Sequence, residues 1–235
     1  MKQVYLDNAA TTPVRLEVEV AMRPYFCEKY GNPSGVYQMS SENRGMIENV
    51  REQIAKTLNA SAEEIYFTSG GTESDNWALV GCAYANRRQG KHIISTVFEH
   101  AAVSAPLAAL EEQGFEITKI PVDANGILSM EKLESAIRPD TILVSTMYVN
   151  NEVGAVVPVE EIGKLVHEKN PKTIYHVDAI QGYGKFRIYP KRMGIDLLSV
   201  SSHKIHGPKG VGFLYVNEKI KIQPMILGEI GRAHV

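Results

Sequence analysis

A lysine in a glycine-containing segment and an aspartate upstream of it are the residues of this chain whose types best fit a chemical reaction. Asp178 lies in the segment 176–181, and Lys204 lies in the segment 201–210. A lysine amine can hold an aldehyde cofactor as a Schiff base, and an aspartate on a pyridine nitrogen keeps that ring protonated and electron-withdrawing. The pair therefore predicts pyridoxal phosphate chemistry. Lys209 is the competing lysine, but its Gly-Pro-Lys-Gly turn predicts an exposed side chain.

These residues must be positioned by a fold in which strands and helices alternate. Apolar runs with strand character occur at residues 65–67, 92–94, 141–144, 174–177, 197–200 and 211–216. Helical patterns occur at about 14–29, 36–59, 72–88, 101–113, 130–137 and 158–169. The alternation predicts an α/β fold, with a mostly parallel sheet sandwiched by helices. Ligands of such folds gather at the carboxyl ends of the strands.

A Ser-Gly-Gly-Thr turn at residues 69–72 joins a predicted strand to a predicted helix. The first amides of a helix and its dipole attract anions, and glycine lets the backbone approach them closely. The Thr72 hydroxyl adds a donor. We therefore predict a phosphate site at Gly71 and Thr72, although the same pattern also occurs as an ordinary helix N-cap.

Two other predicted strand ends carry ionisable side chains. His100 follows a predicted strand at 95–99, where an imidazole could stack on a ring or relay protons, or could be a satisfied histidine of the scaffold. Asp178 ends the predicted strand at 174–177 and could also act as a helix N-cap. A carboxylate in a partly buried strand end needs a cation, which a pyridinium nitrogen would supply.

The composition is that of a globular protein. The 235 residues are 44% hydrophobic and 22% charged, with a net charge of -2, which predicts one large domain and gives no reason to expect nucleic acid or a membrane surface as partner. No apolar run approaches the length of a membrane helix, so we expect a cytoplasmic protein. Cys27 and Cys82 form neither a disulfide framework nor a metal-binding pattern, and we assign catalysis to neither.

Further motifs along the chain resemble those of cysteine desulfurases, the NifS/IscS-like, fold-type I members of the class V aminotransferase family. They occupy residues 5–13, 31–34, 67–74, 99–100 and 150–154, in unbroken order with the lysine segment. Several motifs in order are far harder to obtain by chance than one. The resemblance implies a pyridoxal-phosphate-dependent enzyme that removes sulfur from L-cysteine or a related amino acid, giving L-alanine and an enzyme persulfide for iron-sulfur cluster or thio-cofactor synthesis. It also implies a homodimer and a sulfur-acceptor or iron-sulfur scaffold protein as partner.

The resemblance also implies roles for individual residues. Lys204 and His100 would be catalytic, with His100 stacked on the cofactor ring, and Asn151 would donate to the phenolic oxygen of that ring. The full set of cofactor-binding residues would be Gly71, Thr72, His100, Asn151, Asp178, Gln181, Ser201, His203 and Lys204, and no metal is expected. Gly71 stands where the family usually has alanine, a departure that we expect to preserve the amide geometry.

By resemblance the chain divides into an N-terminal arm (1–13) that would join a small domain, a cofactor-binding large domain (14–226) and a tail (227–235) unlike the family. The tail is a frameshifted end, an added remnant or a real divergence. The family's persulfide-forming cysteine belongs to a C-terminal part that this sequence does not contain. We therefore expect cofactor binding with little or no sulfur transfer unless a partner supplies the thiol. Alternatives are a selenocysteine lyase, another class V aminotransferase-like enzyme, or a non-catalytic dimerisation or scaffold protein.

Overall fold

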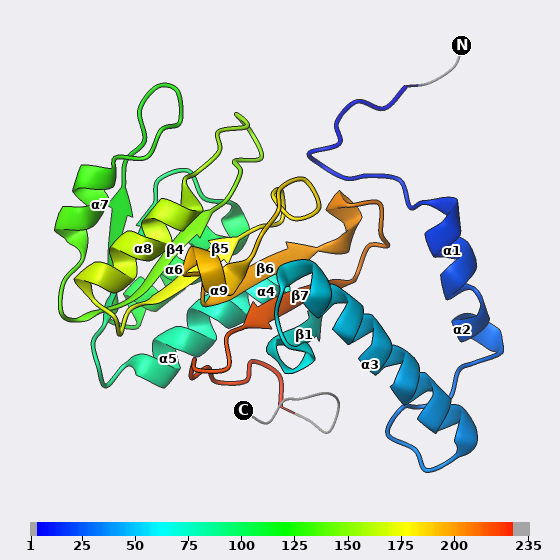
Figure 1. The fold of residues 1–235 in the computed structure, drawn as a ribbon. Helices are drawn as coiled ribbons and strands as arrows, with labels where there is room; N and C mark the ends of the chain where they lie inside the picture. Colours follow the sequence, from blue (N-terminus) through cyan, green and yellow to red (C-terminus); the bar gives the residue numbers. More distant parts are fainter. Residues whose placement is uncertain (1–3, 228–235) are drawn as a thin grey trace.

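A seven-stranded mixed sheet forms the centre of the molecule in the computed structural model, which describes residues 4–227 (Figure 1). The strand order is β1-β7-β6-β5-β4-β2-β3. Strands β3, β2, β4, β5 and β6 pair in parallel, whereas β7 pairs antiparallel with β6 and β1. The strands are β1 Ile65–Thr68, β2 His92–Thr96, β3 Glu116–Ile120, β4 Thr141–Met147, β5 Ile174–Asp178, β6 Leu197–Ser201 and β7 Gly212–Val216. The predicted α/β fold with a mostly parallel sheet is confirmed.

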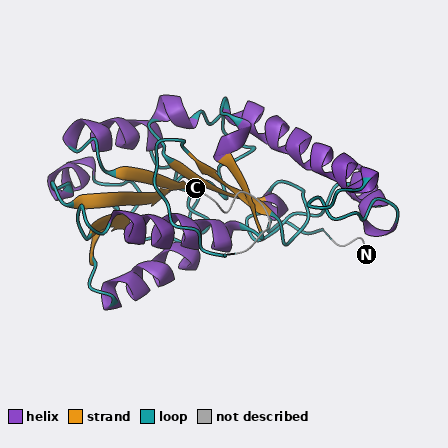
Figure 2. Ribbon diagram, turned by 90° about the horizontal axis from the view of Figure 1, so that it is seen from below, coloured by secondary structure: helices purple, strands orange, loops and turns teal. Residues whose placement is uncertain are grey.

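Helices cover both faces of this sheet (Figure 2). The α-helices are α1 Leu16–Met22, α2 Pro24–Cys27, α3 Gln38–Leu58, α4 Gly71–Asn76, α5 Cys82–Asn86, α6 Ala101–Glu112, α7 Met130–Ala136, α8 Val159–Lys169 and α9 Pro190–Met193. Shorter elements are the 3-10 helices η1 Ala62–Glu64 and η3 Ser202–Lys204, and the π-helix η2 Trp77–Gly81. One apolar core lies between the sheet and α3, α7, α8 and α9, and a second lies between the sheet and η2, α5 and α6.

The interior strands are buried along their whole length. In β5, Ile174 packs into one core while Tyr175 and Val177 pack into the other. Strands covered on both faces read as nearly continuous apolar runs, which is why the sequence predicts them. The two polar residues of β5, His176 and Asp178, are exceptions to this pattern, and both are buried in the carboxyl-terminal half of the strand.

Three elements differ from the prediction. The helix predicted at 14–29 is divided into α1 and α2, because Pro24 has no N–H to continue the first helix and begins the second. The helix predicted at 72–88 contains the π-helix η2 between α4 and α5. The edge strand β3 was not predicted, since exposed Glu116 and Lys119 interrupt its apolar pattern, as charged residues commonly do in edge strands.

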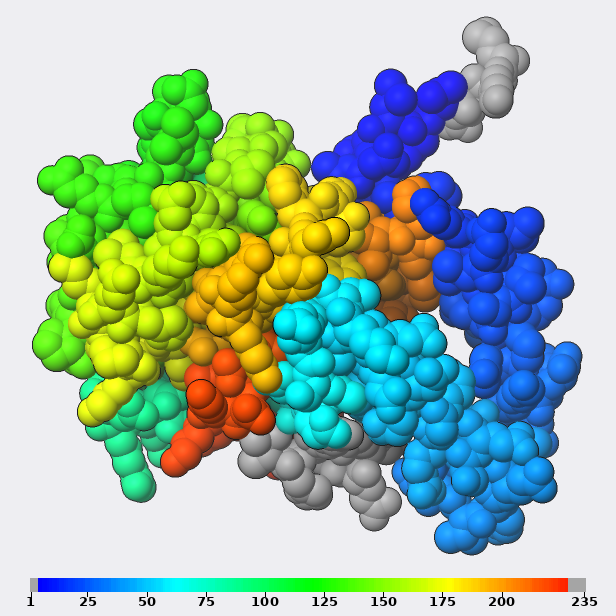
Figure 3. All heavy atoms as spheres, viewed as in Figure 1, coloured from blue at the N-terminus to red at the C-terminus, as the bar shows by residue number. Residues whose placement is uncertain are grey.

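The N-terminal arm (residues 4–13) lies against the loop that follows β6 (Figure 3). Thr12 is buried, and its N–H and hydroxyl donate to the His203 carbonyl oxygen at 2.9 and 2.8 Å. The Arg15 N–H donates to the His206 carbonyl oxygen. The arm thus reaches the loop that carries Lys204. Among residues 4–227, no helix is both long and apolar enough to cross a membrane.

Candidate active site

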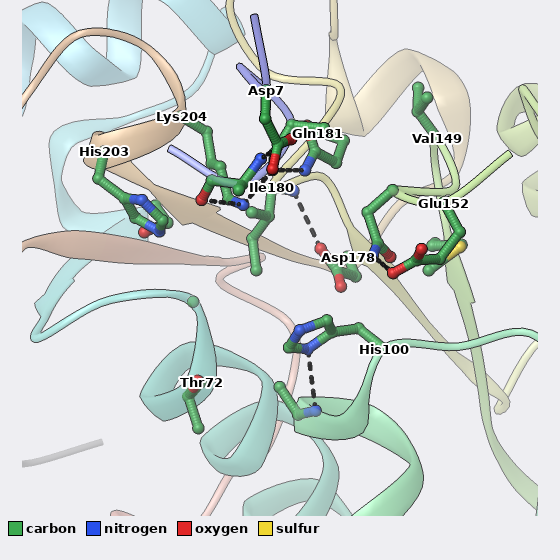
Figure 4. A pocket seen from close by; sticks show the side chains of 17 residues that line it. Asp7, Thr72, His100, Val149, Glu152, Asp178, Ile180, Gln181, His203 and Lys204 are labelled. Atoms are coloured by element: carbon green, nitrogen blue, oxygen red, sulfur yellow. Dashed lines mark hydrogen bonds between the residues drawn. The ribbon is translucent and has the colours of Figure 1, made fainter. Parts of the chain in front are cut away.

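A pocket of about 490 Å³ opens where several strands end together (Figure 4). Strand β1 is antiparallel to β7, which is antiparallel to β6, so the carboxyl ends of β1, β6, β5, β4 and β2 lie at one edge of the sheet. All nine residues predicted from the sequence line this pocket: Gly71, Thr72, His100, Asn151, Asp178, Gln181, Ser201, His203 and Lys204. The roles that the sequence suggested for them stay predictions.

Lys204 ends η3 directly after β6 and points into the pocket from the side covered by the arm. Its Nζ donates to the carbonyl oxygens of Ala9 and Ala10. Burial lowers the pKa of Lys204, nearby Lys185 lowers it further, and Asp7 opposes both effects. A lowered pKa favours the neutral amine, which is the nucleophilic form.

The competing lysine, Lys209, is exposed at the tip of the following loop and does not line the pocket.

Asp178 is the last residue of β5, and no helix follows it, so it is not a helix N-cap. Its Oδ1 accepts a hydrogen bond from the Ile180 N–H at 2.9 Å, which fixes the carboxyl group at the base of the pocket. Burial raises the pKa of Asp178, while the Ile180 N–H and the nearby His100 and Lys204 side chains lower it. Ionisation of this carboxyl is therefore favoured by positive charge in the pocket.

Two further buried acids lie close to Asp178, and sequence reasoning missed both. Neither carboxyl oxygen of Asp75, on α4, has a hydrogen-bond partner among the described residues, and burial raises its pKa well above the usual range, with Asp178 adding to the effect. Burial also raises the pKa of Glu99 to about 8. The His176 ring is 3.6 Å from Asp75, and burial lowers its pKa to about 3, so it is neutral.

No sequence spacing marks these acids, which become neighbours only through the fold. Within the described part of the chain, no group of His, Cys, Asp or Glu side chains is arranged to hold a metal ion.

The turn between β1 and α4 forms another wall of the pocket. Gly70 has a φ of 148°, a conformation that L-residues rarely adopt, and it lets the chain turn sharply into α4. The Ser69 N–H and hydroxyl both donate to Glu73 Oε2, at 2.7 and 2.6 Å, which fixes the turn. The amides at the start of α4 have no carbonyl partner within the helix, so Gly71 and Thr72 present donors suited to an anion.

His100 is the N-cap of α6. Its Nδ1 accepts a hydrogen bond from the Ala102 N–H at 3.0 Å, so the neutral ring carries its proton on Nε2. The strand predicted at 95–99 was misplaced, since β2 ends at Thr96 and a turn precedes His100. The imidazole is exposed at the pocket wall, and its edge that carries Nε2 is not used by the helix cap.

The remaining predicted residues have protein partners in this structure. Gln181 Nε2 donates to the Ala9 carbonyl oxygen at 2.7 Å, and Asn151 Nδ2 donates to Glu152 Oε1 at 2.8 Å. His203 Nδ1 is 3.1 Å from Thr11 Oγ1. Burial lowers the pKa of His203, with Lys204 and Lys209 contributing in the same direction. Ser201 is buried at the end of β6.

Comparisons with known proteins agree with this geometry. The family model described as "Aminotransferase class-V" matches residues 4–230. The chain belongs to the class V aminotransferase family. Cysteine desulfurase IscS of Methanosarcina thermophila is 50% identical over 227 residues, which cover 97% of this chain and 56% of that relative. The IscS of Clostridium botulinum is 49% identical over 227 residues, covering 97% of this chain and 57% of its own length.

Solved structures of this family show the same fold. A NifS-like protein superposes with a TM-score of 0.95 at 42% identity, covering 97% of this chain and 62% of that chain. The structure titled "SspA in complex with cysteine" superposes with a TM-score of 0.93 at 38% identity, covering 97% and 65%. The resemblance to NifS/IscS-like cysteine desulfurases, which are pyridoxal-phosphate-dependent fold-type I enzymes, is thus confirmed. The chain spans a little over half the length of the curated relatives.

Proposed function

We propose that this chain forms the cofactor-binding part of a pyridoxal-phosphate-dependent cysteine desulfurase. One observation carries the proposal: an amine from Lys204, a buried carboxyl from Asp178 and the helix start at Gly71 converge on one pocket. These three features match the aldehyde, the ring nitrogen and the phosphate of pyridoxal phosphate. The identities to IscS proteins support the same reading.

The electrostatics of the pocket fit this cofactor. Asp178, Asp75 and Glu99 are carboxyl groups held away from water, and burial raises the pKa of each. Such a cluster disfavours negative charge unless a cation is present, and a protonated pyridine ring is a cation. The phosphate would meet the opposite type of surface, namely the amides of Gly71 and Thr72 at a helix start.

When bound, pyridoxal phosphate supplies an electrophilic aldehyde and an electron-accepting ring. Lys204 would hold the aldehyde, and its depressed pKa makes the neutral amine more available. The Lys204 amine donates hydrogen bonds to the Ala9 and Ala10 carbonyl oxygens, and these bonds would have to be given up when the amine holds the aldehyde. Asp178 would orient and charge-balance the ring nitrogen.

His100 presents Nε2 to the pocket and would move the substrate α-proton together with Lys204, because Nδ1 is held by α6. Thr72, Ser201 and His203 would hold the phosphate, whereas Asn151 and Gln181 would donate to the ring substituents. The domain division proposed with this assignment is an arm at 1–13, which would join a small domain, and a cofactor-binding large domain at 14–226. Of the proposed tail at 227–235, residues 228–235 lie outside the described residues.

The sulfur-transfer step needs a thiolate that attacks the substrate sulfur and breaks its bond to carbon, leaving a persulfide and alanine. Cys82 is buried in α5, and burial raises the pKa of its thiol. Cys27 is exposed, and neither cysteine lines the pocket. We therefore propose that the thiol comes from outside the pocket described here, with L-cysteine as substrate, a homodimer as the assembly, a sulfur acceptor or iron-sulfur scaffold as partner, and the cytoplasm as location.

The test is titration of the purified chain with pyridoxal phosphate, followed by borohydride reduction and peptide mapping. We expect a yellow absorbance band and a label on Lys204. Lys204→Ala should abolish the covalent label, and the matched control Lys209→Ala, an exposed lysine of the same loop, should keep it. A wild-type protein that is colourless after the free cofactor is removed, or a label that persists in Lys204→Ala, would refute the proposal.

A second measurement tests the sulfur-transfer step. Alanine and sulfide should not form from cysteine when the chain is assayed alone. Turnover by the isolated chain at the rate of a complete desulfurase would show that one of its own cysteines acts.

A further inference from the structure

The Ile180 side chain fills the space in the pocket wall that a side chain at position 71 would need. A Cβ atom added at Gly71 would lie 2.1 Å from Ile180 Cδ1 and 2.9 Å from Ile180 Cγ1. Both distances are far below ordinary van der Waals contact, and both residues line the pocket. Gly71, unlike Gly70, does not have a positive φ, so its backbone conformation does not require glycine. What requires glycine at position 71 is the Ile180 side chain.

The backbone of Ile180 is held in place. Its N–H donates to Asp178 Oδ1, and the preceding Ala179 N–H donates to the Ser199 carbonyl oxygen at 3.0 Å. Isoleucine is also branched at Cβ, which restricts its first torsion. A larger residue at position 71 would therefore leave the backbone of Ile180 in place and turn the end of its side chain into the pocket.

We propose that Ile180 is a positioning residue that sets the depth of the cofactor slot between Asp178 and the start of α4. The absence of a side chain at Gly71 leaves the room that Ile180 needs. In Figure 4 the Ile180 side chain extends from the level of Lys204 toward the helix that carries Thr72. It is half-buried, and it offers an aliphatic surface to a planar heteroaromatic ring. The inference rests on the proposed function, because the ring that would contact Ile180 is the pyridine ring of pyridoxal phosphate.

A double-mutant cycle tests this coupling with two readouts. The proteins are the wild type, Gly71→Ala, Ile180→Ala and the double variant. The first readout is the thermal midpoint of the cofactor-free protein, and the second is the dissociation constant for pyridoxal phosphate from fluorescence titration. Val149→Ala, alone and combined with Gly71→Ala, is the matched control, since Val149 is a half-buried aliphatic residue of the same pocket that does not contact Gly71.

We expect Gly71→Ala to lower the thermal midpoint by about 2 °C or more, because overpacking is destabilising. It should weaken pyridoxal phosphate binding about tenfold. Replacing Ile180 in the Gly71→Ala background should return the dissociation constant to within about threefold of the wild type, whereas replacing Val149 should not.

Additive effects in both readouts would overturn the proposal. Coupling in the thermal midpoint with equal dissociation constants in all four proteins would also overturn it, since Ile180 would then only pack. A failure of the proposed function is seen separately, in a wild type that binds no pyridoxal phosphate.

Discussion

Glu99 gives the sharpest test of the electrostatics beneath the pocket. Its Oε1 accepts hydrogen bonds from the Thr96 hydroxyl at 2.5 Å and the Met147 N–H at 3.1 Å. Its Oε2 is shielded from water and has no hydrogen-bond partner among the described residues. Burial raises the pKa of Glu99 from 4.5 to about 8, with Asp178 adding to the rise and the two hydrogen bonds opposing it. Glu99→Gln mimics the protonated acid and removes the titration.

The sign and size of the effect follow from linkage. Because the pKa of Glu99 is higher in the folded protein, its contribution to stability is complete below pH 4.5 and is lost as the pH rises through 8. The whole interval corresponds to roughly 5 kcal/mol at about 1.4 kcal/mol per pH unit. Folding lowers the pKa of His176 from 6.5 to about 3, so the contribution of His176 to the pH dependence of stability lies below pH 6.5. Between pH 6.5 and 8 the loss assigned to Glu99 is therefore about 2 kcal/mol.

The assay is urea unfolding of cofactor-free wild type and Glu99→Gln at several pH values across this interval. We expect the free energy of unfolding of the wild type to fall by about 2 kcal/mol relative to that of Glu99→Gln as the pH rises from 6.5 to 8. Glu116→Gln is the matched control, because Arg138 lowers the pKa of exposed Glu116 and its carboxylate does not titrate in this interval. Parallel stability curves for the wild type and Glu99→Gln would show that Glu99 is not held protonated by the fold.

Two further predictions concern packing and the cofactor. Gly163→Ala should cost about 1–3 kcal/mol of unfolding free energy, because its Cβ would lie 2.1 Å from the Met193 carbonyl oxygen. Gly45→Ala, in an exposed helical position with open space, should instead add about 0.5–1 kcal/mol, and equal effects in urea unfolding would contradict both. Asp178→Asn cannot ionise, so it should weaken pyridoxal phosphate binding at least about tenfold in an equilibrium titration; unchanged affinity would exclude a charge-balancing role.

The sequence predicted those parts of the molecule that are encoded locally. The interior strands carry continuous apolar runs, and the strand order brings their ends together, so residues as distant as Thr72 and Lys204 were correctly expected near one another. Pro24 is a local signal that the prediction of a single N-terminal helix overlooked. Strand β3 was missed because its identity depends on pairing with β2 and its own residues are partly charged.

Contacts between distant segments could not be read in this way. The hydrogen bonds from Lys204 to Ala9 and Ala10 join residues separated by 195 and 194 positions. Asp75 looks like any polar residue of a helix until the fold buries it. The close approach of Ile180 to Gly71 depends on the turn after β5, which places Ile180 Cδ1 2.1 Å from the position of a Cβ atom at residue 71, and no residue pattern reports such a distance.

The three buried acids are not equivalent, and the difference determines where the pocket carries its charge. Lys204 and His100 lower the pKa of Asp178, whereas burial and the nearby Asp178 both raise the pKa of Asp75 and of Glu99. Positive charge in the pocket therefore favours ionisation of Asp178, whose negative charge in turn raises the pKa of the other two acids. The basic side chains of the pocket thus act on the carboxyl proposed to meet the ring nitrogen. It follows that Glu99→Gln should change stability while Asp178→Asn should change cofactor affinity, so the two variants separate these effects.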